Sequence, residues 1–101
     1  MEAKIRIDLK DIVKLQNLYM EIFEEEDSDY VDRRVVAIKE KAVQRILDKI
    51  TKEKFNQYEI WHVIQTQSWN GTDNTYKPIC GRLRKLGYEI GGINAKYRNF
   101  K

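Results

Sequence analysis

The most constraining feature of this sequence is a change of periodicity at Gly87. From residue 76 to residue 86, apolar side chains recur every three or four positions, the spacing of one helix face: Tyr76, Ile79, Leu83 and Leu86. Thr75 suits the N-cap position, and Pro78 falls in the first turn, where a missing N–H costs little. Gly87 occupies the usual C′ position. The pattern predicts a helix over residues 76–86.

Beyond Gly87 the pattern indicates strands. Residues 88–90 and 93–100 predict two short strands joined at Gly91-Gly92, a dipeptide that tolerates the positive φ of a tight hairpin turn. In the second strand, the alternation of a strand separates an apolar side from a polar and basic side. The apolar side holds Ile93, Ala95 and Tyr97, and the other side holds Asn94, Lys96 and Arg98. We therefore expect a basic β-hairpin after the helix.

The order of helix, Gly/Asn/Thr-rich connection, basic helix and basic hairpin resembles a winged helix-turn-helix. The string GRLRKLGYEI, residues 81–90, resembles the end of a recognition helix that runs into the first wing strand of that superfamily. This resemblance covers roughly the last 45 to 65 residues, and the connection at residues 69–75 is longer than the short turn usual in the family. It implies a mainly α fold with a small β-hairpin, of the α+β class, preceded by a long N-terminal helix.

Three further helices are expected upstream. Asp8 suits the N-cap of a first helix over about 9–25, which carries a wide apolar stripe. A second helix is expected over about 31–52. Asn56 suits the N-cap of a third, over about 57–67. Residues 3–7 fit a short strand.

Charge is distributed unevenly along the chain. Residues 1–30 hold four basic and nine acidic residues, whereas residues 31–101 hold fifteen basic and seven acidic ones. A segregated field of this kind indicates that the C-terminal part faces a polyanion. With 101 residues, the chain is expected to form a single domain, 1–101. Within it we expect an acidic N-terminal helical extension over about 1–30 and a winged-helix-like core over about 31–101.

The resemblance implies double-stranded DNA as the partner, with the helix in the major groove and the hairpin over the backbone. The expected DNA contacts are Asn74, Thr75, Lys77, Arg82, Arg84, Lys85, Lys96 and Arg98. The resemblance further implies a small prokaryotic, phage or plasmid transcriptional regulator. A solvated Lys/Arg face without a partner is the alternative. Gly81, in the middle of the helix, costs about 1 kcal/mol relative to Ala, and either admits a close approach of another backbone or is simply tolerated.

Other residues carry weaker signals of chemistry. The acidic residues 24–27 and 29 lack the spacing of a calcium loop, so a solvated helix end or a protein-contact patch is expected rather than a metal site. His62 is expected to be structural or exposed, and Cys80 to be a small core residue. Trp61 and Trp69 are expected in the core or at its edge, with stacking on single strands as the alternative. No catalytic constellation or cofactor motif is visible, so we expect neither an enzyme nor a cofactor, and no small-molecule substrate is evident.

The wide apolar stripe of the first helix does not by itself show which surface it packs against. It fits packing within the domain or against a second copy in a homodimer. The rival to DNA binding is a protein–protein interaction module that uses the acidic first helix on a winged-helix scaffold. The absence of a long apolar run argues against a membrane span, and a lone cysteine fits a cytoplasmic location.

Overall fold

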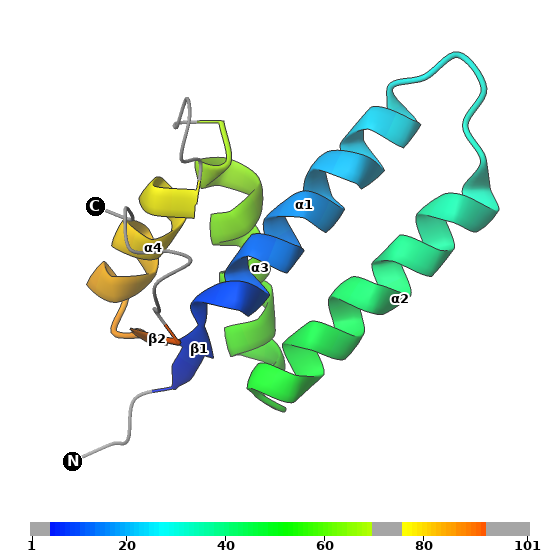
Figure 1. Ribbon diagram of the computed structural model, residues 1–101. Coiled ribbons are helices and arrows are strands. Elements are labelled where there is room, and N and C mark those ends of the chain that lie inside the picture. The colour runs from blue at the N-terminus through cyan, green and yellow to red at the C-terminus, as the bar shows by residue number, and fades with distance from the viewer. Residues whose placement is uncertain (1–4, 70–75, 93–101) are drawn as a thin grey trace.

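The computed structural model describes residues 5–69 and 76–92. The elements follow the order β1 (Arg6–Asp8), α1 (Leu9–Glu26), α2 (Arg33–Ile50), α3 (Lys54–Gln67), α4 (Tyr76–Lys85) and β2 (Glu89–Gly91). The described chain is therefore mainly helical with a small sheet, which confirms the expected α+β class (Figure 1). Four helices and the short first strand lie close to their predicted positions.

Helix α1 forms the centre of the core. Its wide apolar stripe is buried, with Leu9, Ile12 and Leu15 completely covered. It packs against α2, α3 and α4, so its three neighbours together cover a stripe too wide for one partner. The segment expected as an acidic N-terminal extension, about 1–30, thus includes a helix, α1, that supplies much of the core.

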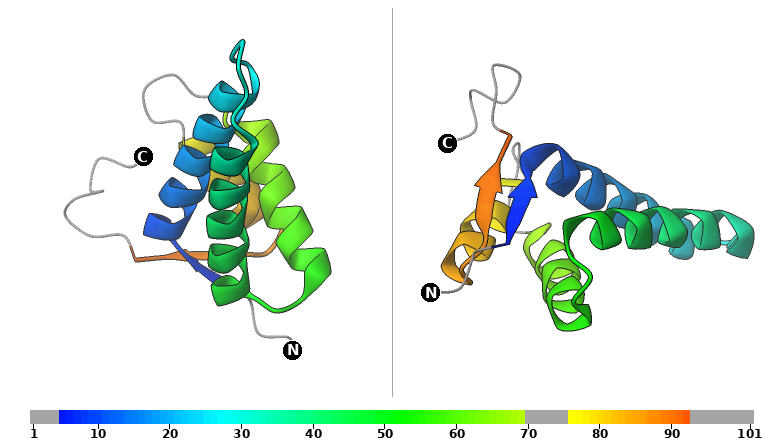
Figure 2. Two further views of the ribbon diagram at one scale, coloured as in Figure 1. Left: turned by 90° about the vertical axis from the view of Figure 1, so that its right-hand side faces the viewer. Right: turned by 90° about the horizontal axis from the view of Figure 1, so that it is seen from below.

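Helices α1 and α2 form an antiparallel hairpin that projects from the rest of the molecule (Figure 2). The turn is held by local polar contacts: the Asp32 carboxylate accepts from the Arg34 backbone N–H at 3.0 Å, and the Glu25 carboxylate accepts from the Asp32 N–H at 3.0 Å. Lys39 and Glu21 link the two helices by an ion pair of 2.7 Å. The projection gives the molecule an elongated outline of 47 × 31 × 22 Å.

The corner between α2 and α3 is fixed by a buried glutamine. Gln57 donates from Nε2 to Asp48 Oδ1 at 2.8 Å and to the Thr51 carbonyl at 2.7 Å, and it accepts from Gln44 at 2.9 Å. The hydrogen bonds from Gln57 and Gln44 lower the pKa of the Asp48 carboxyl. Helix α3 begins at Lys54, with Glu53 in the N-cap position, about one turn before the start that was expected from Asn56.

Helix α4 ends in a Schellman cap. Gly87 has φ of +102°, the Tyr88 N–H donates to the Leu83 carbonyl, and the Gly87 N–H donates to the Arg84 carbonyl, both at 3.0 Å. Gly87 as the C′ residue is thus confirmed. The prediction that Leu86 shares the buried face is wrong, because the helix ends at Lys85 and Leu86 lies in the cap, 38% exposed.

The two strands pair in parallel, with Ile7 opposite Ile90. Residues 88–90 were expected to pair with residues 93–100 in a hairpin; that second strand lies outside the described residues. In the described part, β2 has β1 as its neighbour. The pairing anchors the strand that follows α4 to the strand that precedes α1, and α4 packs against α1 and α3.

Leu83 and Leu86 offer a matched test of this packing. Leu83 is 0% exposed, whereas Leu86 is 38% exposed on the same helix end. We predict that Leu83→Ala lowers the free energy of unfolding by about 2–5 kcal/mol. Leu86→Ala should lower it by no more than about 1 kcal/mol. Urea denaturation followed by circular dichroism measures both, and equal losses would contradict the packing of α4.

Candidate nucleic-acid interface

Helix α4 carries basic side chains on every side that the core leaves uncovered. Its buried residues, Ile79, Cys80 and Leu83, fix the inner face. Lys77 is half-buried at the start of the helix, and the other three predicted contacts in it are exposed: Arg82, Arg84 and Lys85. The helix contains no acidic residue. The structure therefore brings four of the predicted DNA contacts onto one short helix at the surface.

The remaining predicted contacts lie outside the described residues. These are Asn74 and Thr75, before α4, and Lys96 and Arg98, in the expected second wing strand. In the described chain beyond α4, the exposed charged side chain is Glu89, in β2.

Gly81 lies on the outer side of α4. A Cβ added there would meet no atom of the described residues within 4 Å, so the packing of the described core does not require glycine at this position. Glycine inside a helix costs about 1 kcal/mol relative to alanine. Gly81 lies four residues from both Lys77 and Lys85, so its bare backbone falls between two basic positions on one helix face.

Tyr88 holds the far end of α4 in place, and the sequence reasoning assigned it only to a strand. Its hydroxyl donates to Glu59 Oε1 at 2.6 Å and lies 3.2 Å from Asn56 Oδ1, both on α3. Burial, reinforced by the hydrogen bond to Glu59, raises the pKa of the Tyr88 phenol well above its usual value, so it stays protonated. An aromatic residue directly after a C′ glycine was the available signal, because the C″ side chain commonly packs on C3.

Cys80 is completely buried, which confirms its expected place in the core. Burial raises the pKa of the Cys80 thiol to about 11, although the nearby Arg84 charge opposes the shift. The thiol is therefore protonated at neutral pH and poorly nucleophilic. Cys80 serves to pack α4 against its neighbours and offers no reactive centre.

The outer surface of α3 carries aromatic rings. His62 is exposed and stacks on Tyr58, with ring centroids 6.3 Å apart and an interplanar angle of 14°. Trp61 lies at the edge of the core against Tyr19, and Trp69 is 50% exposed. The core-edge position expected for Trp61 is confirmed, whereas Trp69 is one of the exposed hydrophobic residues. His62 is a surface residue as expected.

The acidic residues 24–27 and 29 lie at the end of α1 and in the turn that follows it. Within residues 5–69 and 76–92, no three His, Cys, Asp or Glu side chains gather in a way that could hold a metal ion. Glu25 instead receives the Asp32 N–H, a structural role at the turn. Among the described helices, none has the length and apolar character needed to cross a lipid bilayer.

No protein-family model, curated protein or solved structure matches this chain, so its function has to be inferred from its own residues.

Proposed function

We propose that the protein binds double-stranded DNA without catalysis and that α4 is its recognition helix, as in a small winged-helix transcriptional regulator. The observation that carries this proposal is the division of α4 into two sides. One side is completely buried through Ile79, Cys80 and Leu83, and the other sides present lysine and arginine with no acidic residue between them. A helix of this kind fits the major groove, which is about 12 Å wide.

The distribution of charge supports an oriented approach to DNA. The acidic turn between α1 and α2 and the basic helix α4 lie at opposite ends of the molecule (Figure 1). A dipolar charge distribution turns the basic end toward a polyanion and keeps the acidic end away. The expected wing residues, Lys96 and Arg98, add two further positive charges in the sequence after β2.

A salt titration tests the electrostatic part of the proposal. If four to six phosphates are contacted, the logarithm of the binding constant should fall against the logarithm of salt concentration with a slope of about −4 to −5. Arg82→Ala and Lys85→Ala should each reduce that slope by about one, whereas Lys41→Ala, an exposed change on α2, should leave it unchanged. Fluorescence anisotropy with a labelled duplex measures these slopes. Absence of duplex binding at low salt would refute the proposal.

Gly81→Ala separates stability from binding. The added methyl group meets open space, so the variant should be more stable by about 0.5–1 kcal/mol. If the DNA backbone approaches α4 at Gly81, the same variant should bind duplex DNA more weakly. Thermal denaturation and anisotropy on the same preparation measure the two effects. A stabilised variant with unchanged affinity would show that the glycine does not serve DNA binding.

Helix and wing should differ in what they contribute. Phosphate contacts position a protein without reading sequence, whereas contacts to base edges discriminate. We predict that Lys96→Ala and Arg98→Ala weaken binding equally to all duplexes. Changes at Asn74, Lys77 or Arg84 should instead reduce the difference in binding free energy between preferred and random DNA by about 1–3 kcal/mol. Competition between a selected duplex and random duplexes measures the gap. Loss of preference in the wing variants alone would assign recognition to the wing.

A further inference from the structure

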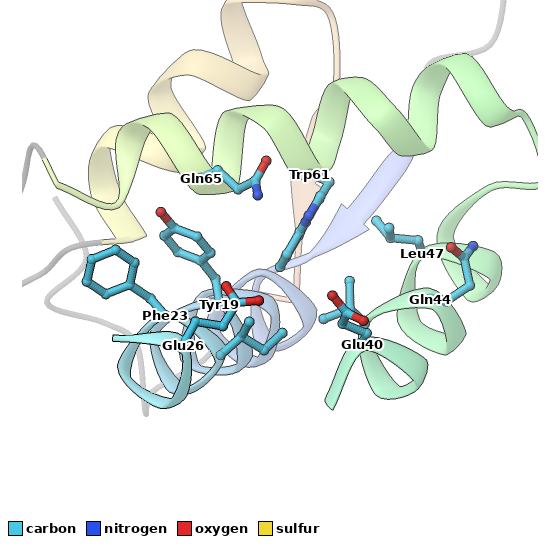
Figure 3. A pocket seen from close by; sticks show the side chains of 10 residues that line it. Tyr19, Phe23, Glu26, Glu40, Gln44, Leu47, Trp61 and Gln65 are labelled. Carbon is cyan, nitrogen blue, oxygen red and sulfur yellow. The ribbon is translucent and has the colours of Figure 1, made fainter. Parts of the chain in front are cut away.

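A groove runs between α2 and α3 on the side of the molecule where the helical hairpin projects (Figure 3). Both helices pack against α1, but contacts between α2 and α3 themselves are sparse beyond their shared corner. The floor of the groove is formed by the buried side chains of Ile22, Val43 and Leu47. Its volume is about 310 Å³, which suits a few anchoring side chains.

Aromatic rings line the α1 and α3 sides of this groove. Tyr19 meets Trp61 edge-on at a centroid distance of 5.9 Å, and Phe23 lies next to Tyr19 (Figure 3). Trp69 extends the aromatic surface, because its ring lies 5.1 Å from that of Phe23 and its Nε1 donates to Tyr19 Oη at 3.1 Å. Phe23 remains 44% exposed and Trp69 50% exposed, so large apolar rings face solvent beside an open groove. Such clusters mark binding surfaces.

The charged side chains that line the groove itself are acidic. Glu26 and Glu40 are the charged side chains among the described residues that line it, and both are exposed. The adjoining part of α1 and its turn, residues 15–32, hold seven acidic residues and no lysine or arginine. An occupant that brings cations to the rim of an apolar groove is complementary to this surface.

We infer that this groove, formed by α1, α2 and α3, binds a basic amphipathic helix of a partner protein. Apolar side chains of that helix, spaced at i, i+3, i+4 and i+7, would enter between Trp61 and Leu47, and its lysines or arginines would meet Glu26 and Glu40. A symmetric dimer through this face would bring two acidic segments together, which disfavours a second copy as the occupant. Nucleic acid is repelled by the same charge. The site is separate from α4 and does not depend on DNA binding.

A synthetic peptide tests this inference. The probe is a helical peptide of about 18 leucines and lysines with leucine at the spacing above, and its leucine–glutamate counterpart serves as the reverse probe. Of the two tryptophans of the chain, Trp61 lines the groove and Trp69 contacts the lining residue Phe23. A shift of intrinsic emission therefore reports occupancy by a peptide without tryptophan. The lysine peptide should bind and shift the emission, and the glutamate peptide should not.

Charge reversal at the rim gives the decisive comparison. The double variant Glu26→Lys with Glu40→Lys should lower the affinity for the lysine peptide by at least about tenfold and should bind the glutamate peptide. The control variant, Glu24→Lys with Asp29→Lys, makes the same change of charge at exposed residues that do not line the groove. It should lower the affinity for the lysine peptide by less than about threefold. Circular dichroism checks that both variants keep their helices.

Three results would overturn the inference. The first is no binding of the lysine peptide to the unmodified protein. The second is an equal loss in the rim variant and the control variant, which would reduce the effect to general attraction by an acidic surface. The third is a dimer in analytical ultracentrifugation that the rim variant strengthens, which would make a second copy the occupant of the groove.

Discussion

The rest of the structure depends on the burial of α1. Its apolar stripe is wider than one neighbouring helix can cover, and Leu9, Ile12 and Leu15 are covered only because α2, α3 and α4 approach it from different sides. Fully burying side chains of this kind contributes about 1.5–3 kcal/mol each, which is large against the net stability of a small domain. The helix that ends in the acidic run is thus also the one around which the other helices assemble.

The two proposed sites lie where the helices that pack on α1 leave part of their own surfaces uncovered. The apolar residues of α4 pack against α1 and α3, and the Schellman cap at Gly87 together with Tyr88 fixes its far end. The basic residues of α4 therefore face outward. α2 and α3 diverge from the Gln57 corner, which leaves the aromatic groove open. One surface is basic and convex, and the other is apolar and rimmed by carboxylates. They suit different partners and lie on different helices.

The sequence predicted the helices and the cap because those features are local. Periodicity located four helices, and Gly87 was assigned from its place after Leu86. Features that depend on distant residues could not be predicted from the sequence. Tyr88 donates a hydrogen bond to Glu59, 29 positions away, and β2 pairs with β1. Leu86 was misplaced because helical period alone does not show that the helix has already ended at Lys85. The groove was not predicted, because Tyr19 and Phe23 fall on the apolar stripe of α1 and such a stripe predicts burial, although the structure covers both side chains only in part.

The parallel pairing of β1 with β2 has a consequence for how the chain folds during synthesis. The paired residues, Ile7 and Ile90, are separated by roughly 80 positions, whereas α1 and α2 are neighbours in the chain. Contacts between distant positions form slowly because closing a long loop costs entropy before any contact is gained. Helices α1 and α2 can therefore pair while translation is still under way. Strand β1 stays unpaired until residues 89–91 have left the ribosome. Because the residues that line the groove precede α4 in the chain, they leave the ribosome first. If both proposals hold, a partner of the groove would therefore have access to its site earlier in synthesis than DNA would have to α4.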